Sequence, residues 1–293
     1  MSFSRRSIGV ALILLIITSQ SACVFSKKAR VATAALLLED VAKAAYKQSD
    51  LKVIRDGMPA YLMLMDGMIE AWPDNEQLLI AAAQAYSSFA SIFGDDQDKE
   101  YSKQLLGKAR DYALQSLIQR GFKDPIKSSF DDFTTDVKAS GKKDVPYVFW
   151  AATCWASWIM LNLDSMEAMA ELPRVELMMH RCLELDEEFY YGGPHLFMGM
   201  WLSARPAIAG GDLQKAQEHF LKALDLGEGK FLMAYVYYAE YYARRAMEKD
   251  LFVSILKKVV DTPADYSPEL TLLNTVAKTK AQEMLNNADE YFE

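Results

Sequence analysis

The sequence predicts an all-α fold, a tetratricopeptide-like solenoid of helical hairpins with elongated repeats and a C-terminal capping helix. Apolar residues recur with helical spacing along almost the whole chain, and no stretch has the alternation of a convincing strand. Glycine and proline are scarce, with 14 and 9 among 293 residues, which disfavours turn-rich β sandwiches. Apolar residues make up 51% and charged residues 25%, as in a globular protein.

The charge balance is acidic. Lys and Arg number 32 against 40 Asp and Glu, a net charge of −8, which becomes −10 once the N-terminal segment with its two arginines is removed. A protein that binds nucleic acid neutralises phosphates with a basic surface. The sequence therefore predicts no nucleic-acid partner.

Residues 1–22 have the pattern of an export signal. Arg5 and Arg6 precede an apolar run at 8–17, which as a helix is about 15 Å long and too short to span a bilayer. Ser21 and Ala22 stand directly before Cys23, and together they resemble a bacterial lipobox, although Gln20 departs from the leucine usual in that motif. We expect a lipoprotein signal peptide; ordinary cleavage that leaves Cys23 free is the alternative.

Acylation at Cys23 would attach the chain to a lipid bilayer, with residues 23–30 as an acylated tether. Residues 31–293 then form a single solenoid domain that faces the periplasm of a bacterial cell envelope. The residue after Cys23 is Val24 and not Asp, which favours the outer membrane as the place of the anchor.

The repeat is clearest at residues 211–227, where Gly211 and Asp212 precede Ala216, Phe220 and Ala223. This stretch resembles the second helix of a tetratricopeptide repeat, in which small residues let two helices approach and a large one fills the groove beside them. The same order of small and large residues recurs three times: Ala60-Leu64-Gly67-Met68, Ala109-Ala113-Ser116-Leu117 and Val175-Met179-Cys182-Leu183.

The other elements follow from their periodicity. Helices are expected over 31–47, 78–93 and 147–163, and 251–260 is assigned to the second helix of a fifth pair. A helix over 270–285 would cap the stack, and 286–293 would be a frayed tail. The polar insertion at 122–145 is expected on the surface as a loop with one short helix.

Cys154 and Cys182 are the other two cysteines. Cys182 occupies the small-residue position of its ladder, which favours a buried packing role. Both cysteines also lie at similar distances from the connection between their helices, so a disulfide in an oxidising compartment stays open.

No enzyme signature is present: the three histidines form no zinc spacing, and no phosphate loop or nucleophile elbow occurs. We therefore expect no catalytic activity, no metal and no cofactor. Aromatic residues cluster at helical spacing instead, which fits either an ordinary packed core or an aromatic cavity open to a ligand. The candidate ligand-binding residues are Tyr147, Trp150, Trp155, Trp158, His195, Phe197, Trp201, Arg205, Tyr235 and Tyr238.

His195 and Arg205 belong to a specialised stretch that begins with Gly192-Gly193-Pro194, where the glycines allow a sharp turn and proline suits the first helical turn. Ten residues separate them, about 15 Å along a helix, so they can hold one small group only if the helix is interrupted. Pro206 can bend the helix near Ser203 or Ala204.

Several short sequence segments together resemble the TatT family, the tetratricopeptide lipoproteins associated with TRAP transporters. They are WAATCWASW at 150–158, ELPRV at 171–175, GGPHLFMG at 192–199, followed by RP, and the repeat at 210–224. The resemblance implies an envelope protein with an internal pore or cleft through each subunit, and it leaves a homotrimer open as the assembly.

Its implied partners are a periplasmic solute-binding protein and a TRAP permease, to which it would pass a small apolar or carboxylated ligand. The alternative is a scaffold lipoprotein that assembles proteins in the envelope and binds no small molecule.

Overall fold

The computed structural model describes residues 27–94 and 99–292, and all the regular structure in these two ranges is helical. The all-α prediction is confirmed for these residues. The predicted signal peptide, Cys23 and the first part of the tether lie outside them. A helix over residues 27–46, here called the N-terminal helix, already includes the last four residues of the predicted tether. No helix within the described ranges is both long and apolar enough to cross a membrane.

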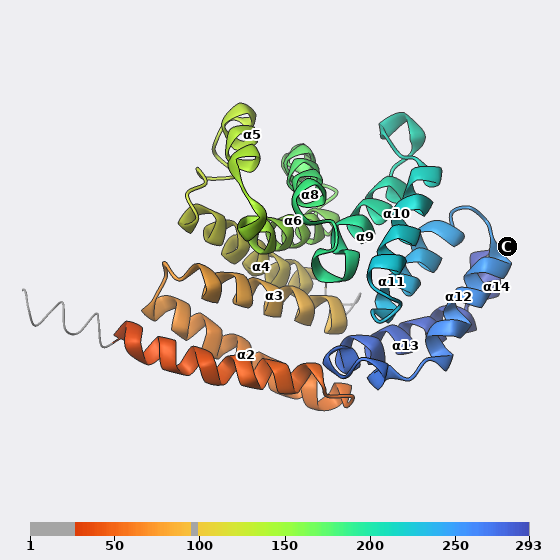
Figure 1. Ribbon diagram of the computed structural model, residues 1–293, viewed down its shortest axis with the longest axis horizontal. Helices are drawn as coiled ribbons and strands as arrows, with labels where there is room; N and C mark the ends of the chain where they lie inside the picture. The colour runs from red at the N-terminus through yellow and green to blue at the C-terminus, as the bar shows by residue number, and fades with distance from the viewer. Residues whose placement is uncertain (1–26, 95–98, 293) are drawn as a thin grey trace, which may run out of the picture.

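The α-helices follow one another with short connections (Figure 1). After the N-terminal helix they are α2 (Leu51–Ala71), α3 (Glu76–Phe93), α4 (Lys99–Gln119), α5 (Phe130–Ala139), α6 (Val145–Met160), α7 (Met166–Ala170), α8 (Leu172–Asp186), α9 (Phe189–Ala204), α10 (Leu213–Leu226), α11 (Leu232–Tyr237), α12 (Lys249–Asp261), α13 (Thr271–Asn286) and α14 (Ala288–Tyr291). Residues Tyr238–Ala243 continue α11 as a π-helical segment, η3.

The helices pack in consecutive pairs, which is consistent with a helical repeat. α3 packs on α4, α6 on α8, α9 on α10 and α12 on α13, and α4 also packs on α6 to join two pairs. The succession curves around a centre, so that α13 near the C-terminus contacts α2 near the N-terminus (Figure 1). Helices from both ends of the chain therefore surround the same central region.

Side-chain caps begin several of these helices where the sequence signals predicted. The Asn75 side chain accepts a hydrogen bond from the backbone N–H of Leu78, and the Asp212 side chain accepts one from that of Lys215. Each cap satisfies an N–H that has no partner inside the helix. The turns before α3 and α10 are thus set by local chemistry.

The small-and-large ladder is buried in three of its four occurrences. Ala109, Ala113 and Leu117 of α4 are fully buried, as are Val175, Met179 and Cys182 of α8 and Ala216, Phe220 and Ala223 of α10. Gly199 of α9 shows how close the helices come, because an added Cβ there would lie 3.0 Å from the Phe220 ring. Small residues thus let the paired helices approach, as predicted.

The fourth ladder, in α2, was predicted in the wrong phase. Leu64 is 57% exposed and Ala60 and Gly67 also face outward, so Met68 is the one buried member of this ladder. The other buried residues of α2 are Ile54, Leu62, Met65 and Ile69. α2 has no preceding repeat to receive its outer face, so that face stays open.

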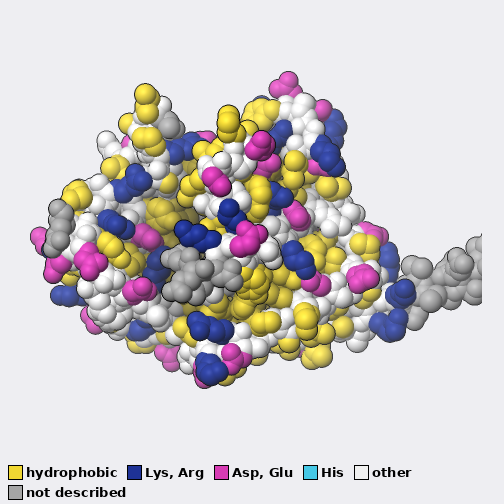
Figure 2. Space-filling view, turned by 180° about the vertical axis from the view of Figure 1, so that it is seen from behind, with side chains coloured by type: hydrophobic (Ala, Val, Ile, Leu, Met, Phe, Trp, Pro, Cys, Tyr) yellow, Lys and Arg dark blue, Asp and Glu magenta, His cyan; other side chains and the backbone are white. Residues whose placement is uncertain are grey.

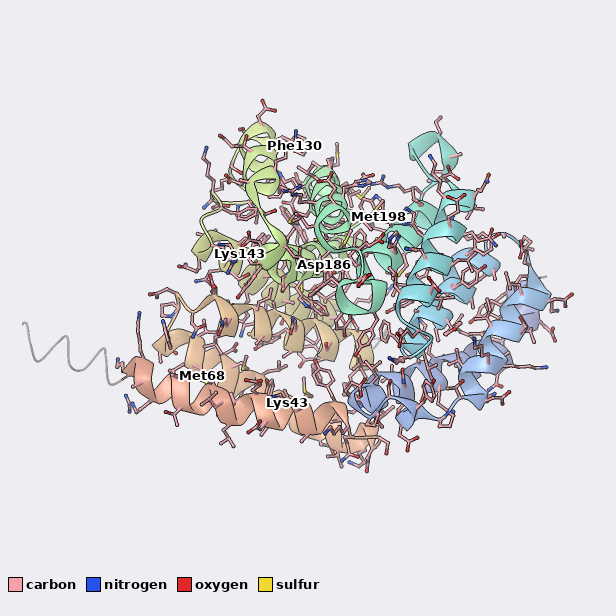
Figure 3. All side chains as sticks on the ribbon, viewed as in Figure 1. Lys43, Met68, Phe130, Lys143, Asp186 and Met198 are labelled. Atoms are coloured by element: carbon pink, nitrogen blue, oxygen red, sulfur yellow. The ribbon has the colours of Figure 1, made fainter. Side chains whose placement is uncertain are left out.

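The insertion contains one short helix, α5, as predicted, but it is not wholly a surface feature. Phe133 and Val137 of α5 are fully buried against α8, and the Phe133 ring meets Trp155 edge-on at 6.3 Å. The outer end of the helix carries the exposed Phe130 (Figure 3). The polar composition of the insertion hid a two-residue apolar stripe that anchors it.

The C-terminal segment also differs from its prediction. α13 forms where the capping helix was expected, but residues 288–291 form α14 and do not fray. The rings of Tyr291 and Phe292 lie 5.9 Å and 5.2 Å from that of Phe252, a fully buried residue of α12. Aromatic contacts with the preceding pair therefore order the end of the chain.

The thiols of Cys154 and Cys182 are both free and fully buried, so no disulfide joins them. The Cys154 thiol points at the backbone carbonyl of Ala83, at 3.8 Å, across the contact between α6 and α3. Both cysteines act as small core residues, which is the packing role that the ladder suggested for Cys182.

Candidate functional site

Five partly exposed tyrosines surround the centre of the molecule, and we call them the inner tyrosine surface. They come from segments far apart in sequence: Tyr46 from the N-terminal helix, Tyr190 and Tyr191 from the start of α9, Tyr237 from α11 and Tyr241 from η3. In the view from behind, hydrophobic side chains gather in the middle of the face among scattered charges (Figure 2).

The tyrosines lie near one another. Burial raises the pKa of Tyr190 most, and the phenols of Tyr46, Tyr191 and Tyr237 raise it further through their charge. The rings of Tyr190 and Tyr191 are 5.7 Å apart, and those of Tyr237 and Tyr241 are 6.0 Å apart. The two ends of the chain therefore contribute to one aromatic surface.

Their hydroxyl groups are poorly hydrated although their rings remain accessible. Desolvation raises the pKa of Tyr46, which is 37% exposed, and raises that of Tyr237 to about 12. Among the described residues, the hydroxyls of Tyr46, Tyr190, Tyr237 and Tyr241 have no hydrogen-bond partner, so they are neutral donors open to a ligand.

A left-handed turn presents Tyr190 and Tyr191. Tyr190, Tyr191 and Gly192 have φ values of 49°, 59° and 73°, so the regular part of α9 starts only after them. Two non-glycine residues in this region store strain that the surrounding structure must offset. The turn is pressed onto α10, because a Cβ on Gly192 would lie 3.0 Å from the Cα of Ala223.

One ion pair lies beside the tyrosines. Lys280 Nζ of α13 is 2.8 Å from Glu240 Oε2 of η3, and it lies 5.7 Å from the centre of the Tyr237 ring. Glu240 adds to the effect of burial in raising the pKa of Tyr237, and also that of Tyr241. The inner tyrosine surface thus combines aromatic faces and phenol donors with one ion pair, Lys280–Glu240.

Of the residues predicted to bind a ligand, Trp150 is the one that contacts this surface. Its ring lies 4.9 Å from the Tyr190 ring in an edge-on arrangement, and Phe149 packs behind both at 5.3 Å and 6.1 Å. Trp155, on the other face of α6, is fully buried and donates from Nε1 to Glu171 Oε2 at 2.5 Å. Trp155 is thus a core residue in this conformation.

The other predicted residues of α6 make local polar contacts. The guanidinium of Arg110 lies 3.8 Å from the centre of the Trp158 ring. Tyr147 is stacked under Arg120 at 4.2 Å, and Arg120 also pairs with Glu76 at 2.7 Å. The two cation–π contacts join α4 and the residue after it to α6, and the ion pair reaches α3, so together they stabilise the stacking of adjacent pairs.

The predicted residues of α9 lie along its length and do not converge. Phe197 and Trp201 stack on each other at 5.6 Å, and Arg205 lies 3.9 Å over the Trp201 ring. α9 ends at Ala204, so Pro206 terminates the helix and does not bend it to bring Arg205 towards His195. His195 instead contacts His219 of α10, with their Nδ1 atoms 2.8 Å apart.

The two predicted tyrosines of the next pair differ from the inner ones in having partners. The Tyr235 hydroxyl accepts a hydrogen bond from Lys258 at 2.9 Å. Tyr238 is buried, stacks on Tyr242 at 5.2 Å and accepts a hydrogen bond from Gln217 at 3.2 Å. A ligand-binding role for these residues and for those of α6 and α9 stays a prediction.

Sequence reasoning missed most of the inner tyrosine surface. Tyr237 and Tyr241 form one stripe at helical spacing, and Tyr235, Tyr238 and Tyr242 form another beside it. The sequence does not show which of the two stripes points towards the centre of the molecule. Tyr46 and Tyr190 gave no local signal, because only the curvature of the whole chain brings them together.

Among the described residues, no group of three or more His, Cys, Asp or Glu side chains is placed to hold a metal ion. Comparison with curated proteins gave no match to this chain. A family model for the TRAP transporter T-component, TAtT, matches residues 47–292, which is most of the chain. This is a family of transporter accessory components and not a family of enzymes. On that match, the chain belongs to the TRAP transporter T-component family.

Proposed function

We propose that this accessory component holds a small, largely apolar ligand with a carboxylate on the inner tyrosine surface and passes it to a periplasmic solute-binding protein. The observation that supports it is the convergence of partly exposed tyrosines from four segments, of which Tyr46, Tyr190, Tyr237 and Tyr241 have hydroxyls without a hydrogen-bond partner among the described residues. A packed core would bury these rings and satisfy or exclude their hydroxyls.

The chemistry of the surface suits such a ligand. Aromatic faces shelter apolar groups from water, and a few polar groups among them fix the orientation of a bound molecule. A phenol with its ordinary pKa of about 10 is already protonated at neutral pH, and burial raises the pKa of Tyr190 and Tyr237 further, so each offers a donor to an oxygen acceptor. Lys280 is the cation that a ligand carboxylate would approach, and the ligand would share its ammonium group with Glu240.

The rest of the proposal concerns location and shape. The paired helices form a tetratricopeptide-like solenoid, whose open side offers a docking surface for the solute-binding protein. Acylation of Cys23 would tether it to the envelope, with the outer membrane the favoured site. The described part of the N-terminal helix starts four residues after that cysteine and carries the exposed Lys27 and Arg30, so the folded body would stay close to the lipid headgroups.

The test is native mass spectrometry of the full-length protein processed in its bacterial host, followed by solvent extraction. We expect one small molecule per subunit in the wild type and in the control Tyr266→Ala, which alters an exposed tyrosine elsewhere. The double variant Tyr237→Phe/Tyr241→Phe keeps the rings and removes two hydroxyls, so it should retain several-fold less. Equal retention in all three proteins, or no molecule in any, would refute the proposal.

A scaffold function is the second candidate, and one observation favours it. Leu36 and Leu37 of the N-terminal helix and Met63 and Leu64 of α2 are between 57% and 71% exposed, which leaves an apolar face suited to another protein. If the apolar face alone matters, Leu64→Asp will abolish co-purification of an envelope partner while the extract contains no small molecule. A homotrimer would also use such a face.

A further inference from the structure

The contact between His195 and His219 joins α9 to α10 immediately after the left-handed turn. Their Nδ1 atoms are 2.8 Å apart, and the other ring nitrogen of His195, Nε2, lies 3.0 Å from Glu187 Oε2. Glu187 precedes the turn and His195 follows it. The three side chains therefore close the loop of chain that contains Tyr190, Tyr191 and Gly192.

The hydrogen bond between the rings sets a limit on their protonation. Two facing Nδ1 atoms can share one proton, with one ring as donor and the other as acceptor. A neutral pair satisfies this condition, and so does a pair in which His195 is the imidazolium and donates to both Glu187 and His219. When both rings are charged, two N–H groups face each other and the bond is lost.

The charged groups around the two histidines affect how readily both rings can be protonated. Desolvation, and then the charges of His195 and of His180 on α8, lower the pKa of His219 to about 4. Glu187 Oε2 lies 3.0 Å from Nε2 of His195, and Lys222 of α10 pairs with the other oxygen of Glu187 at 3.5 Å. His180 itself lies 4.0 Å from Glu176. Burial and the neighbouring positive charges therefore oppose the protonation of His219.

The turn depends on this bond more than a regular helix would. Its two left-handed tyrosines are strained, so they hold their conformation only while packing and hydrogen bonds around them persist. Tyr190 and Tyr191 are also the residues through which α9 contributes to the inner tyrosine surface. A loss of the His195–His219 contact would act on that surface directly.

We propose that His195 and His219 form an acid-sensitive latch: protonation of both rings breaks their hydrogen bond, separates α9 from α10 beside the turn and releases Tyr190 and Tyr191. Its consequence, release of a bound ligand in acid, rests on the proposed function. His195 and His219 are positioning residues, since they act through the turn.

Hydrogen exchange of the full-length protein tests the latch. We expect exchange of the backbone amides of residues 190–195, corrected for its intrinsic pH dependence, to rise about tenfold or more as pH falls from about 7 to about 4. His219→Asn places an amide near the Nδ1 position and cannot be protonated, so this rise should disappear. His180→Asn is the matched control and should keep it.

The chain has three histidines, so their ring signals in NMR can be followed separately in the wild type. The His219 titration should coincide with the rise in exchange, which keeps the proposal testable if His219→Asn fails to fold. A rise of the same size and midpoint in a folded His219→Asn protein, or a His219 titration without any rise, would overturn the latch.

Ligand retention is measured in the same samples, so the two proposals fail in different ways. A protein that shows the acid rise but never holds a small molecule refutes ligand binding and leaves the latch standing. A protein that holds its ligand at neutral pH but shows no acid rise refutes the latch alone.

Discussion

Nη1 of Arg205 lies 3.1 Å from Oε2 of Glu176, and this ion pair joins the residue that ends α9 to the first half of α8. The same guanidinium covers the ring of Trp201. Arg205 thus connects two successive helix pairs by its ion pair and stacks on a ring of α9, although the sequence suggested a role in ligand binding.

We expect Arg205→Ala to lower the free energy of unfolding by about 1–2 kcal/mol, because the stacking and the partly buried ion pair are both lost. Arg205→Lys keeps the charge and loses the planar stacking, so its free energy of unfolding should lie between those of the wild type and Arg205→Ala. Urea denaturation measures both, and a double-mutant cycle with Glu176→Gln isolates the ion pair. No change in Arg205→Ala would contradict this assignment.

Trp155 should be a strong determinant of stability. It is fully buried and its indole N–H has one acceptor, Glu171. Trp155→Ala leaves a large cavity and should lower the free energy of unfolding by about 3–5 kcal/mol. Trp158→Ala is the control, since Trp158 is partly exposed and should lose less than half as much. Thermal unfolding of both variants checks the difference.

Gly192 should tolerate no side chain. Its φ is +73°, and a Cβ would lie 3.0 Å from the backbone of Ala223, so Gly192→Ala should destabilise the protein by about 1–3 kcal/mol. Gly67→Ala is the matched control, because nothing lies within 4 Å of its added Cβ and alanine favours a helix. In chemical denaturation, the free energy of unfolding should therefore fall for Gly192→Ala and rise for Gly67→Ala.

Asp66 should make stability depend on acidity. Burial by itself would raise its pKa, but hydrogen bonds from Lys108, Tyr112 and Tyr86 outweigh burial and lower the pKa below its ordinary value. The stabilisation is therefore present above the unfolded pKa, about 3.9, and is lost as pH falls through the lower folded value. Asp66→Asn should be about 1–3 kcal/mol less stable at neutral pH.

The difference between wild type and Asp66→Asn should shrink as pH falls below about 4. Asp56→Asn is the control, since Asp56 is 60% exposed and pairs with Lys52 at the surface, and it should change stability by less than about 0.5 kcal/mol. Denaturation curves at several pH values test this. A difference that is constant with pH would show that Asp66 acts through packing alone.

The cysteines give a chemical count of the processed chain. Burial raises the pKa of Cys154 and of Cys182 to about 12, so neither should react with a thiol reagent in the folded protein near pH 8. After denaturation without reductant we expect two reactive thiols if Cys23 is acylated. Three reactive thiols would show that Cys23 is free. If neither Cys154 nor Cys182 reacted, the assignment of both as free thiols would be contradicted.

Local pattern was sufficient for most of the helices. Periodicity located α3, α6, α12 and α13, and the Gly-Asp turn before α10 is capped as expected. The predictions were wrong where contacts with other helices decide whether a segment is ordered or buried. Residues 288–291 are polar by composition yet ordered by Phe252, and the ladder of α2 is exposed because no earlier helix pair covers it.

The sequence by itself determined the all-helical class, the pairing of helices through small-residue ladders and the likeness to the transporter component family, because each depends on residues close together in the chain. Only the tertiary structure decided which aromatics face the centre. Tyr46 and Tyr190 belong to one surface because many small rotations between successive helix pairs add up until α13 reaches α2. That accumulated curvature is a property of all the contacts together, and no short stretch of sequence contains it.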